Sequence, residues 1–376
     1  MPLSSIFQVL GGVGLFLFGI KLMSDALQDL AGDRLRKLIG SLTSTPVRGV
    51  LIGTLVTILI QSSSGTTVMT VSFVHAGLMT LKQAVGVIMG ANIGTTVTAQ
   101  IIAFKFKSFA LPVIGIGMIL AVFGKSKRRK YIGNGLVGFG LLFLGMQTME
   151  SAMSFLQGRK DLFLLFGHNP LLGVLVGTLV TMVVQASSAT IGLTIAMASQ
   201  GLLTLDAAIP ILLGDNIGTT ITAVIASLGS NRSAKQAAAA HVMFNLIGVF
   251  IFVLFLPIFK AAVVLTSSEI ARQLANAHTL FNVVNTLLFL PFTSPFVKVI
   301  QKMVPTKDNG IRVGPQYLDP KLVVASPAAA VDAIKKEIAR MGVVALSMLQ
   351  GVKKAFLEND SKMVEEVNES EKILNE

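Results

Sequence analysis

The chain has 376 residues, of which 52% are hydrophobic and 13% are charged, and its formal net charge is +12. Average soluble domains carry about 25% charged residues, so most of this chain is expected to lie in a lipid bilayer. The basic residues gather in short stretches between hydrophobic segments, as at residues 125–130, which indicates cytoplasmic loops rather than nucleic-acid binding. The sequence has no cysteine, which excludes disulfides, thiolate nucleophiles and cysteine-ligated metals.

Hydrophobic segments follow one another along most of the chain. Seven are expected to cross the membrane, and the first of them is expected to be a retained helix rather than a cleaved signal peptide. Two more segments, residues 47–76 and 170–199, are expected to form re-entrant hairpins, because a polar run divides each into halves too short to span. The crossings are expected at residues 7–23, 83–103, 109–123, 133–149, 207–226, 237–256 and 280–299.

The stretches beside the hairpins carry further expectations. Residues 24–48 are charged and are expected to include a short amphipathic helix. The crossing that follows each hairpin is expected to be interrupted, the first of them at residues 90–94, where glycines flank a polar run. If the hairpins were true crossings instead, the chain would have more spans but the same orientation of its ends.

The two hairpin segments belong to an internal repeat. Residues 46–101 align without a gap to residues 170–225, and 28 of the 56 positions are identical. Similarity this strong indicates duplication. The basic stretches at residues 125–130 and 232–235, and the chain from Lys298 onward, are expected to be cytoplasmic. This orientation makes the two repeats inverted, with the N-terminus outside and the C-terminus inside.

The expected fold class is therefore an all-α polytopic membrane protein of the inner (plasma) membrane. It has two inverted-topology repeats, each with a re-entrant helical hairpin and an interrupted helix, and a short cytoplasmic helical tail. The expected divisions are a first transmembrane repeat at residues 1–130, a second, inverted repeat at 131–305, a linker at 306–324 and a cytoplasmic helical region at 325–376.

Polar motifs interrupt the hydrophobic sequence in both repeats. The first repeat reads Gln-Ser-Ser-Ser-Gly-Thr-Thr at residues 61–67 and the second Gln-Ala-Ser-Ser-Ala-Thr at residues 185–190. Helix N-termini at a hairpin tip offer free N–H groups and positive dipole ends to an anion, and hydroxyls and freed carbonyls suit a hard cation. A site without a fixed cationic side chain holds its anion moderately, which gives a reason for coupling to Na⁺. Close helix packing explains any single Ser or Thr equally well, but the duplication favours a substrate site.

A second polar motif, Gly-x-Asn-Ile-Gly-Thr-Thr, follows each hairpin. Asn92 and Asn216 lie between its glycines and are expected either to brace the hairpin tips or to ligate an ion. Asp215 stands where the first repeat has alanine. Because intramembrane acids are functional by default, we expect it to bind a cation, with an interface role as the alternative. His241 and His278, in two Ala-His-x-x-Phe-Asn sequences, are expected to start helices and to cap or pack near the membrane surface.

Together these motifs resemble those of the type II sodium–phosphate cotransporter family, over roughly residues 7–305. The tail from Ala325 resembles the beginning of the PhoU-like domain of bacterial members. The resemblance implies Na⁺-driven uptake of inorganic phosphate by alternating access in a unit built from inverted repeats.

On this resemblance, phosphate is expected between the two hairpin tips with Na⁺ close by. The second tip departs from the motif at Ala186, which removes one hydroxyl. The expected phosphate-binding residues are Gln61, Ser62, Ser63, Ser64, Gln185, Ser187 and Ser188. The expected sodium-binding residues are Thr66, Asn92, Thr95, Thr190, Asp215, Asn216 and Thr219.

The expected partners are inorganic phosphate, Na⁺ and the lipid bilayer, with a homodimer as an option and no organic cofactor or nucleic acid. Two alternatives stay open. The first is a carrier of another oxyanion, or one coupled to protons. The second is a membrane-anchored regulatory protein that senses phosphate and signals through its tail. An enzyme is not expected, because the sequence has no nucleophile elbow, P-loop or paired catalytic carboxylates.

Overall fold

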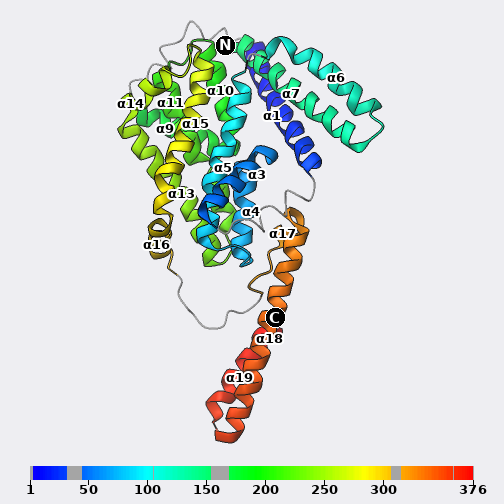
Figure 1. The fold of residues 1–376 in the computed structure, drawn as a ribbon, viewed down its shortest axis with the longest axis vertical. Coiled ribbons are helices and arrows are strands. Elements are labelled where there is room, and N and C mark those ends of the chain that lie inside the picture. The colour runs from blue at the N-terminus through cyan, green and yellow to red at the C-terminus, as the bar shows by residue number, and fades with distance from the viewer. Residues whose placement is uncertain are drawn as a thin grey trace.

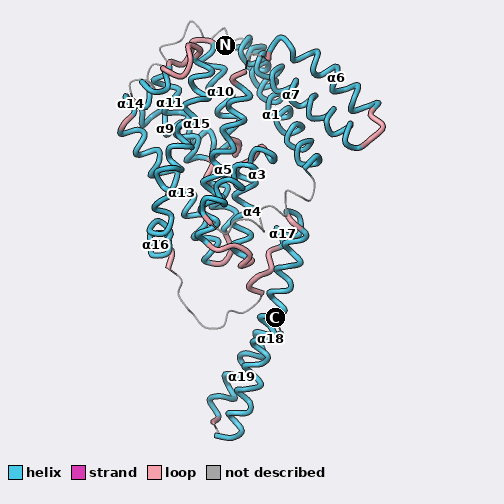
Figure 2. Tube along the Cα trace, in the orientation of Figure 1, coloured by secondary structure: helices cyan, strands magenta, loops and turns pink. Residues whose placement is uncertain are grey.

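The computed structural model describes residues 3–31, 45–104, 106–153, 169–305, 315–358 and 360–375. Within these ranges the chain is helical with short connections and contains no strand (Figure 1; Figure 2). The helices are α1 (Leu3–Ala31), α3 (Pro46–Ile60), α4 (Ser63–His75), α5 (Leu81–Ile102), α6 (Ala110–Phe123), α7 (Lys127–Ala152), α9 (Pro170–Val184), α10 (Ser187–Ser199), α11 (Leu205–Gly218), α12 (Ile221–Ser227), α13 (Arg232–Leu254), α14 (Leu256–Val264), α15 (Ile270–Phe289), α16 (Thr293–Met303), α17 (Pro320–Ala325), α18 (Pro327–Glu358) and α19 (Ser361–Asn375).

Six helical stretches in the described ranges are long and apolar enough to cross a membrane. The seventh expected crossing, at residues 109–123, is α6. Its 14 residues rise about 21 Å, which is less than the hydrocarbon thickness of about 30 Å. The six stretches are Ser4–Ala31, Leu81–Ile102, Lys127–Ala152, Leu205–Ser227, Arg232–Leu254 and Ile270–Met303.

The first helix is longer than its apolar stretch. α1 continues past Met23 to Ala31 without a break, so the first eight residues of the stretch expected to include a short amphipathic helix belong to α1. The rest of that prediction, up to residue 44, lies outside the described residues. α1 runs antiparallel to α7: a Cβ at Gly12 would lie 3.0 Å from the carbonyl oxygen of Gly145, and one at Gly19 would lie 2.7 Å from that of Gly138.

Each hairpin turns at a glutamine in the left-handed backbone region. Gln61 ends α3 and Gln185 ends α9, both with φ of 55°, and they are the only non-glycine residues with positive φ in the described chain. A left-handed conformation costs an ordinary side chain about 1–2 kcal/mol. The same conformation at equivalent positions of both repeats therefore marks these turns as functional candidates.

The helix after each hairpin lies parallel to the first arm of that hairpin. A Cβ at Gly90 of α5 would lie 2.0 Å from the carbonyl oxygen of Val50 on α3, and one at Gly94, a turn later on α5, would lie 2.7 Å from that of Thr54, a turn later on α3. Gly214 and Gly218 of α11 repeat these approaches to the carbonyl oxygens of Val174 and Thr178 on α9, at 2.0 and 2.5 Å. Because α5 starts beside the beginning of α3, the intervening α4 must run back along them. The segments expected to be hairpins are thus folded as helical hairpins.

The predicted interruption of the first repeat's helix is wrong, because α5 is continuous from Leu81 to Ile102. Gly90 and Gly94 serve another purpose: they let α3 approach α5 closely, and a Cβ at Gly94 would lie 2.6 Å from Cβ of Thr57. In the second repeat α11 ends at Gly218 and α12 begins at Ile221, so a break is present there.

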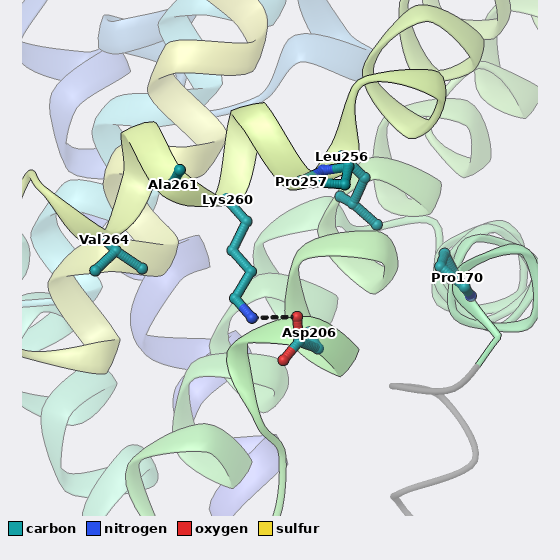
Figure 3. Close-up of a pocket in the computed structure, with 7 residues that line it drawn as sticks. All are labelled: Pro170, Asp206, Leu256, Pro257, Lys260, Ala261 and Val264. Atoms are coloured by element: carbon teal, nitrogen blue, oxygen red, sulfur yellow. Dashed lines mark hydrogen bonds and ion pairs between the residues drawn. The ribbon is translucent and has the colours of Figure 1, made fainter.

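The bases of the two hairpins lie at opposite ends of α13. At its first residues, the Asn231 backbone N–H donates to Nδ1 of His75 at 3.0 Å, where the first hairpin ends. Beyond its last residues, α14 meets the base of the second hairpin in a pocket lined by Pro170, Asp206 and Lys260, the last two paired at 2.5 Å (Figure 3). The 23 residues of α13 rise about 35 Å. The hairpins therefore enter the helical body from opposite ends.

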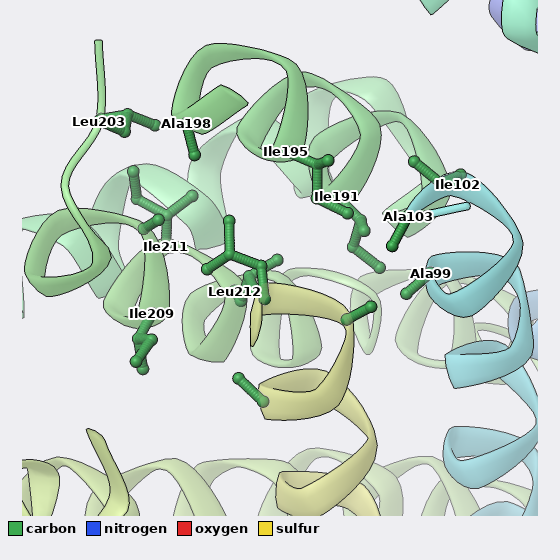
Figure 4. Close-up of a cluster of buried hydrophobic side chains, with 14 of the residues drawn as sticks. Ala99, Ile102, Ala103, Ile191, Ile195, Ala198, Leu203, Ile209, Ile211 and Leu212 are labelled. Carbon is green, nitrogen blue, oxygen red and sulfur yellow. The ribbon is translucent and has the colours of Figure 1, made fainter. Parts of the chain in front are cut away.

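An apolar cluster holds the second hairpin in place. Ile191 and Ile195 of α10 pack beside Ala99 and Ile102 of α5, and Leu212 of α11 belongs to the same cluster (Figure 4). All of these side chains are buried. The second hairpin is thus anchored to α5 of the first repeat, which brings the two repeats into one core.

The tail extends from the helical body but is attached to the first hairpin (Figure 1). The Tyr317 ring lies against Gly77, just after α4, and Lys336 donates to the Gly77 carbonyl. Glu337, only 5% exposed, accepts from the backbone N–H of Gln316 and Tyr317 at 2.9 and 2.8 Å. Leu322 of α17, a helix that starts inside the expected linker, is fully buried in the apolar cluster of the first hairpin.

We predict that Gly53→Ala destabilises the protein by about 1–3 kcal/mol, because the added methyl must displace the Val87 backbone. The matched control is Gly115→Ala on α6, where nothing lies within 4 Å of an added Cβ. It is expected to leave stability unchanged or slightly raised. Thermal unfolding in detergent measures both, and equal midpoints for the two variants would contradict the parallel packing of α3 on α5.

Candidate functional site

The two hairpin tips line one cavity of about 230 Å³. All seven residues expected to bind phosphate lie on its wall, joined by Thr95 from the expected sodium set. The cavity also has lining residues that the sequence did not predict, from α1, α5 and the second tip: Leu17, Ile20, Lys21, Ser24, Thr98 and Ala186.

The N-termini of α4 and α10 meet at this cavity, and they are capped differently. In the first tip the Ser62 hydroxyl accepts from the Gly65 backbone N–H at 3.1 Å and so serves as the N-cap of α4. In the second tip Ala186 has no hydroxyl, and α10 has no side-chain cap. The departure at Ala186 therefore leaves first-turn N–H groups of α10 available to an anion.

The two tip glutamines are in different hydrogen-bonding states. Gln61 donates to the Ile58 carbonyl at 2.6 Å and accepts from the Thr98 hydroxyl at 2.8 Å, so its amide is tied to the protein. Gln185 is exposed. Thr222, the repeat equivalent of Thr98, donates to the Thr219 carbonyl at 2.9 Å instead. The same backbone turn is thus braced in the first repeat and unbraced in the second.

α1 forms a third wall of the cavity. Ser24 donates to the carbonyl of Ile60, the last residue of α3, and Lys21 lies one turn earlier on α1. The sequence analysis missed both, although a lone lysine in an apolar segment is itself a signal for a functional site. It also assumed a site without a fixed cationic side chain, and this assumption is wrong because Lys21 lines the cavity.

A buried polar network lies between the arms of the second hairpin and α11. The Thr181 hydroxyl donates to Oδ1 of Asp215 at 2.9 Å and lies 2.7 Å from the Thr190 hydroxyl. Asp215 is fully buried, and its Oδ2 has no hydrogen-bond partner among the described residues. The first repeat has the matching Thr57–Thr66 bond at 2.9 Å but no carboxylate. A buried carboxylate with an unpartnered oxygen suits a bound cation or proton.

The two motif asparagines brace helices at a distance from the tips. Asn92 donates to Asn245 at 2.7 Å, and its Oδ1 lies 3.3 Å from Nε2 of His241, which ties α5 to α13. Asn216 donates to the Leu212 carbonyl of its own helix at 2.8 Å. Neither lines the cavity between the tips. The expectation that they brace the tips is therefore wrong.

The two motif histidines also differ from expectation. His241 lies in the middle of α13 and His278 in the middle of α15, and both are buried. The prediction that they start helices near the membrane surface is wrong, because each Ala-His-x-x-Phe-Asn sequence faces the packed interior. Among the described residues no group of three His, Asp or Glu side chains is placed to hold a metal ion.

The expected sodium set does not form one site. Thr95 lines the cavity, whereas Thr66, Thr190 and Asp215 are buried in the hydrogen bonds between the hairpin arms and the following helix. The Thr219 hydroxyl donates to the Asp215 carbonyl at 2.9 Å. The structure thus separates an open polar cavity from the buried polar groups behind the two tips.

Comparison with known proteins identifies the family. A model described as Na⁺/Pi-cotransporter matches residues 15–151 and 154–286. The chain belongs to the Na⁺/Pi-cotransporter family. As a member of this cotransporter family it is a membrane transporter and not an enzyme. The matched segments end before the tail, so a PhoU-like character of the tail stays a prediction.

Three relatives show how far along this chain the similarity extends. Uncharacterized protein YqeW of Bacillus subtilis is 32% identical over 295 residues, which cover 78% of this chain and 96% of that protein. The putative inorganic phosphate export protein YjbB of Escherichia coli is 26% identical over 358 residues, 94% of this chain but only 65% of that protein. Human sodium-dependent phosphate transport protein 2B is 40% identical over 97 residues, 25% of this chain and 14% of that protein. No solved structure gives a significant match.

The capping difference between the two tips makes a paired prediction. Ser62→Ala removes the N-cap of α4 and is expected to destabilise the protein by about 0.5–2 kcal/mol, whereas Ala186→Ser adds a cap to α10 and is expected to stabilise it by about 1 kcal/mol. Thermal unfolding in detergent measures both. An unchanged midpoint in Ser62→Ala would show that Ser62 has no capping role, and an unchanged or lowered midpoint in Ala186→Ser would show that α10 gains no cap from a serine there.

Proposed function

We propose that this protein is a sodium-coupled inorganic phosphate symporter that works by alternating access. The observation that carries the proposal is the convergence of both duplicated tips on one polar cavity. A family model for Na⁺/Pi-cotransporters that matches most of the chain supports the choice of substrate and ion. Discontinuous helices that meet between duplicated halves are the usual place of transporter sites.

Phosphate binds between the tips. The hydroxyls of Ser63, Ser64, Ser187 and Ser188 donate to its oxygens, and the first-turn N–H groups of α4 and α10 add donors and favourable helix dipoles. Gln185 has an exposed amide that closes on the anion. Gln61 and Ser62 hold the first tip in shape, since their side chains are bonded to its backbone.

Sodium binds behind the second tip. Asp215 provides a carboxylate, and Thr190 provides a hydroxyl in the same hydrogen-bonded network. Oxygen ligands of this kind suit a hard cation. The expected ligands Thr66, Asn92, Asn216 and Thr219 are already bonded within the protein, so they support the ion site through the surrounding helices. An ion that neutralises Asp215 stabilises the second tip and so favours phosphate binding there.

Alternating access uses the pseudo-symmetry of the two repeats. The antiparallel α1 and α7, and hairpin bases at opposite ends of α13, support an inverted arrangement. The bond between Thr98 and Gln61 is made while the equivalent contact of Thr222 with Gln185 is absent, because Thr222 bonds to its own helix. In the alternate state the Thr98–Gln61 bond breaks and the equivalent Thr222–Gln185 bond forms. This change opens the cavity to the other side of the membrane.

The basic side of the molecule sets the orientation in the inner membrane. Residues 125–130, Arg232 and Lys298 carry the excess of positive charge expected on the cytoplasmic side. Arg232 donates to the Pro305 carbonyl, so the start of α13 and the beginning of the tail segment lie together. This arrangement supports the proposal of a cytoplasmic C-terminus.

Export is the second candidate direction, because the relative matched over 94% of this chain is named as a putative phosphate exporter. The structure of a symporter does not fix its direction of transport, which follows the combined gradients of its substrates. An inward Na⁺ gradient favours uptake. Phosphate flux measured with the Na⁺ gradient applied in either direction distinguishes coupled transport, which reverses with the gradient, from flux that Na⁺ leaves unchanged.

We predict that Gln61→Ala and Ser187→Ala each abolish Na⁺-dependent uptake of radiolabelled phosphate in proteoliposomes. The first removes the brace of its tip and the second removes a hydroxyl from the cavity wall. Ser347→Ala in the exposed part of α18 is the matched control and should transport normally. Competition by sulfate or arsenate, and replacement of Na⁺ by choline, test the alternative substrates and ions. Full uptake by both cavity variants would remove these residues from the site.

We predict that Asp215→Asn raises the Na⁺ concentration for half-maximal uptake by about tenfold or more, equivalent to about 1.4 kcal/mol. The substitution removes the one negative charge buried behind the second tip. The control is Asp206→Asn, whose carboxylate lies 51% exposed in an ion pair with Lys260 and should not affect Na⁺ dependence. An unchanged Na⁺ response of Asp215→Asn would place the sodium ion elsewhere.

A further inference from the structure

We infer that Lys21 of α1 is the charged anchor of the transported anion and sets the affinity for phosphate, a role that deepens the proposed function and rests on it. Among the described residues that line the cavity, Lys21 is the only one with a charged side chain. The other polar groups on the wall are hydroxyls and amides, which donate hydrogen bonds but carry no net charge.

The position of Lys21 on α1 follows from helical geometry. Leu17, Ile20, Lys21 and Ser24 all line the cavity and recur at the i, i+3, i+4 and i+7 spacing of one helix face. This face of α1 is therefore directed at the hairpin tips over two turns. Lys21 lies ten residues before Ala31, the end of α1, so its Cα is about 15 Å from the helix end.

Contacts with both hairpins fix α1 beside the cavity. Ser24, one turn after Lys21, donates to the Ile60 carbonyl at the end of α3. On the other side Phe16 packs against Gly192 of α10 so closely that a Cβ there would lie 2.4 Å from the ring. α1 thus touches an arm of each hairpin, with Lys21 between the two contacts. The backbone of Lys21 is therefore held beside both tips, and its exposed side chain lines the cavity.

The charge of Lys21 fits the chemistry of the site. A lysine inside a membrane span is costly unless it faces a wet cavity or a partner of opposite charge. No acidic residue is among those that line this cavity, so the anion itself is the partner that remains. An ammonium group gives three donors and a compact charge, which suits a phosphate oxygen cluster. The alternative is a structural lysine whose side chain extends along α1 to the membrane surface.

The duplication shows that this charge is supplied once. The glycines at positions 12 and 19 of α1 match those at positions 138 and 145 of α7, and on this alignment Lys21 corresponds to Gln147. The positive charge of Lys21 therefore has no equivalent in the second repeat. A single fixed charge reduces the dependence of phosphate binding on the co-bound ion, so Lys21 determines phosphate affinity while the buried layer around Asp215 determines the sodium response.

The test compares phosphate uptake by Lys21→Ala, Lys21→Arg and wild-type protein in proteoliposomes under a fixed Na⁺ gradient. Loss of a charged hydrogen-bonding partner is expected to raise the KM for phosphate by roughly tenfold or more in Lys21→Ala. Lys21→Arg keeps the charge and should stay within about threefold of wild type. Half-saturating Na⁺ should not change. Lys82→Ala, an exposed lysine at the start of α5, is the matched control and should behave as wild type.

An unchanged KM in Lys21→Ala, or a loss in Lys21→Arg as large as that in Lys21→Ala, would overturn the inference and favour a purely structural lysine. If Lys21→Ala abolishes uptake, phosphate binding is tested instead by thermal unfolding of the purified proteins with and without inorganic phosphate. Stabilisation by phosphate in wild type and Lys21→Arg but not in Lys21→Ala supports the anchor, and equal stabilisation refutes it. Absence of wild-type Na⁺-dependent uptake overturns the proposed function as well, whereas wild-type uptake with an unchanged Lys21→Ala KM overturns only the anchor.

Discussion

The structure depends on one constraint: backbone that breaks inside a membrane must have its polar groups satisfied by protein or by water. Gln61 and Gln185 end their helices in the left-handed conformation, which leaves carbonyls and N–H groups at both tips without partners inside a helix. The close parallel packing of α3 on α5, and of α9 on α11, buries the arms of each hairpin. Only the tips remain, and they open on the same cavity. The cost of the broken backbone is thus confined to this cavity, where we propose that phosphate binds.

Duplication has produced two tips with the same backbone and different chemistry. Ser62 caps its own helix, whereas Ala186 leaves the facing helix uncapped. A carboxylate is buried behind the second tip alone, at Asp215. The two tips therefore differ in structure: the first tip is braced by its own side chains, and the second has an uncapped helix N-terminus with a buried carboxylate behind it. This asymmetry suits a carrier in which one half changes its hydrogen bonds while the other holds its shape.

α1 connects these parts, although it belongs to neither hairpin. Its Ser24 contacts the first hairpin, its Phe16 contacts the second, and Lys21 lies between them on the cavity wall. A movement of either hairpin therefore displaces α1 or breaks one of its contacts. The tail adds a restraint at the opposite end of the first hairpin, where Tyr317 and Lys336 hold the loop at Gly77. The first hairpin is fixed at its tip and at its base.

The sequence by itself determined the membrane class, the repeat, both hairpins and the polar residues of their tips, because these follow from composition, spacing and duplication. It did not determine what each glycine or amide does. Gly90 fits a broken helix and a close helix contact equally well, and only the structure showed that α5 is continuous and approaches Val50 at this glycine. Lys21 and Asn92 likewise depend on helices far apart in the chain: packing put the lysine on the cavity wall and bound the asparagine to Asn245. Local pattern fixes where backbone turns, but the partner of a polar side chain is decided by tertiary packing.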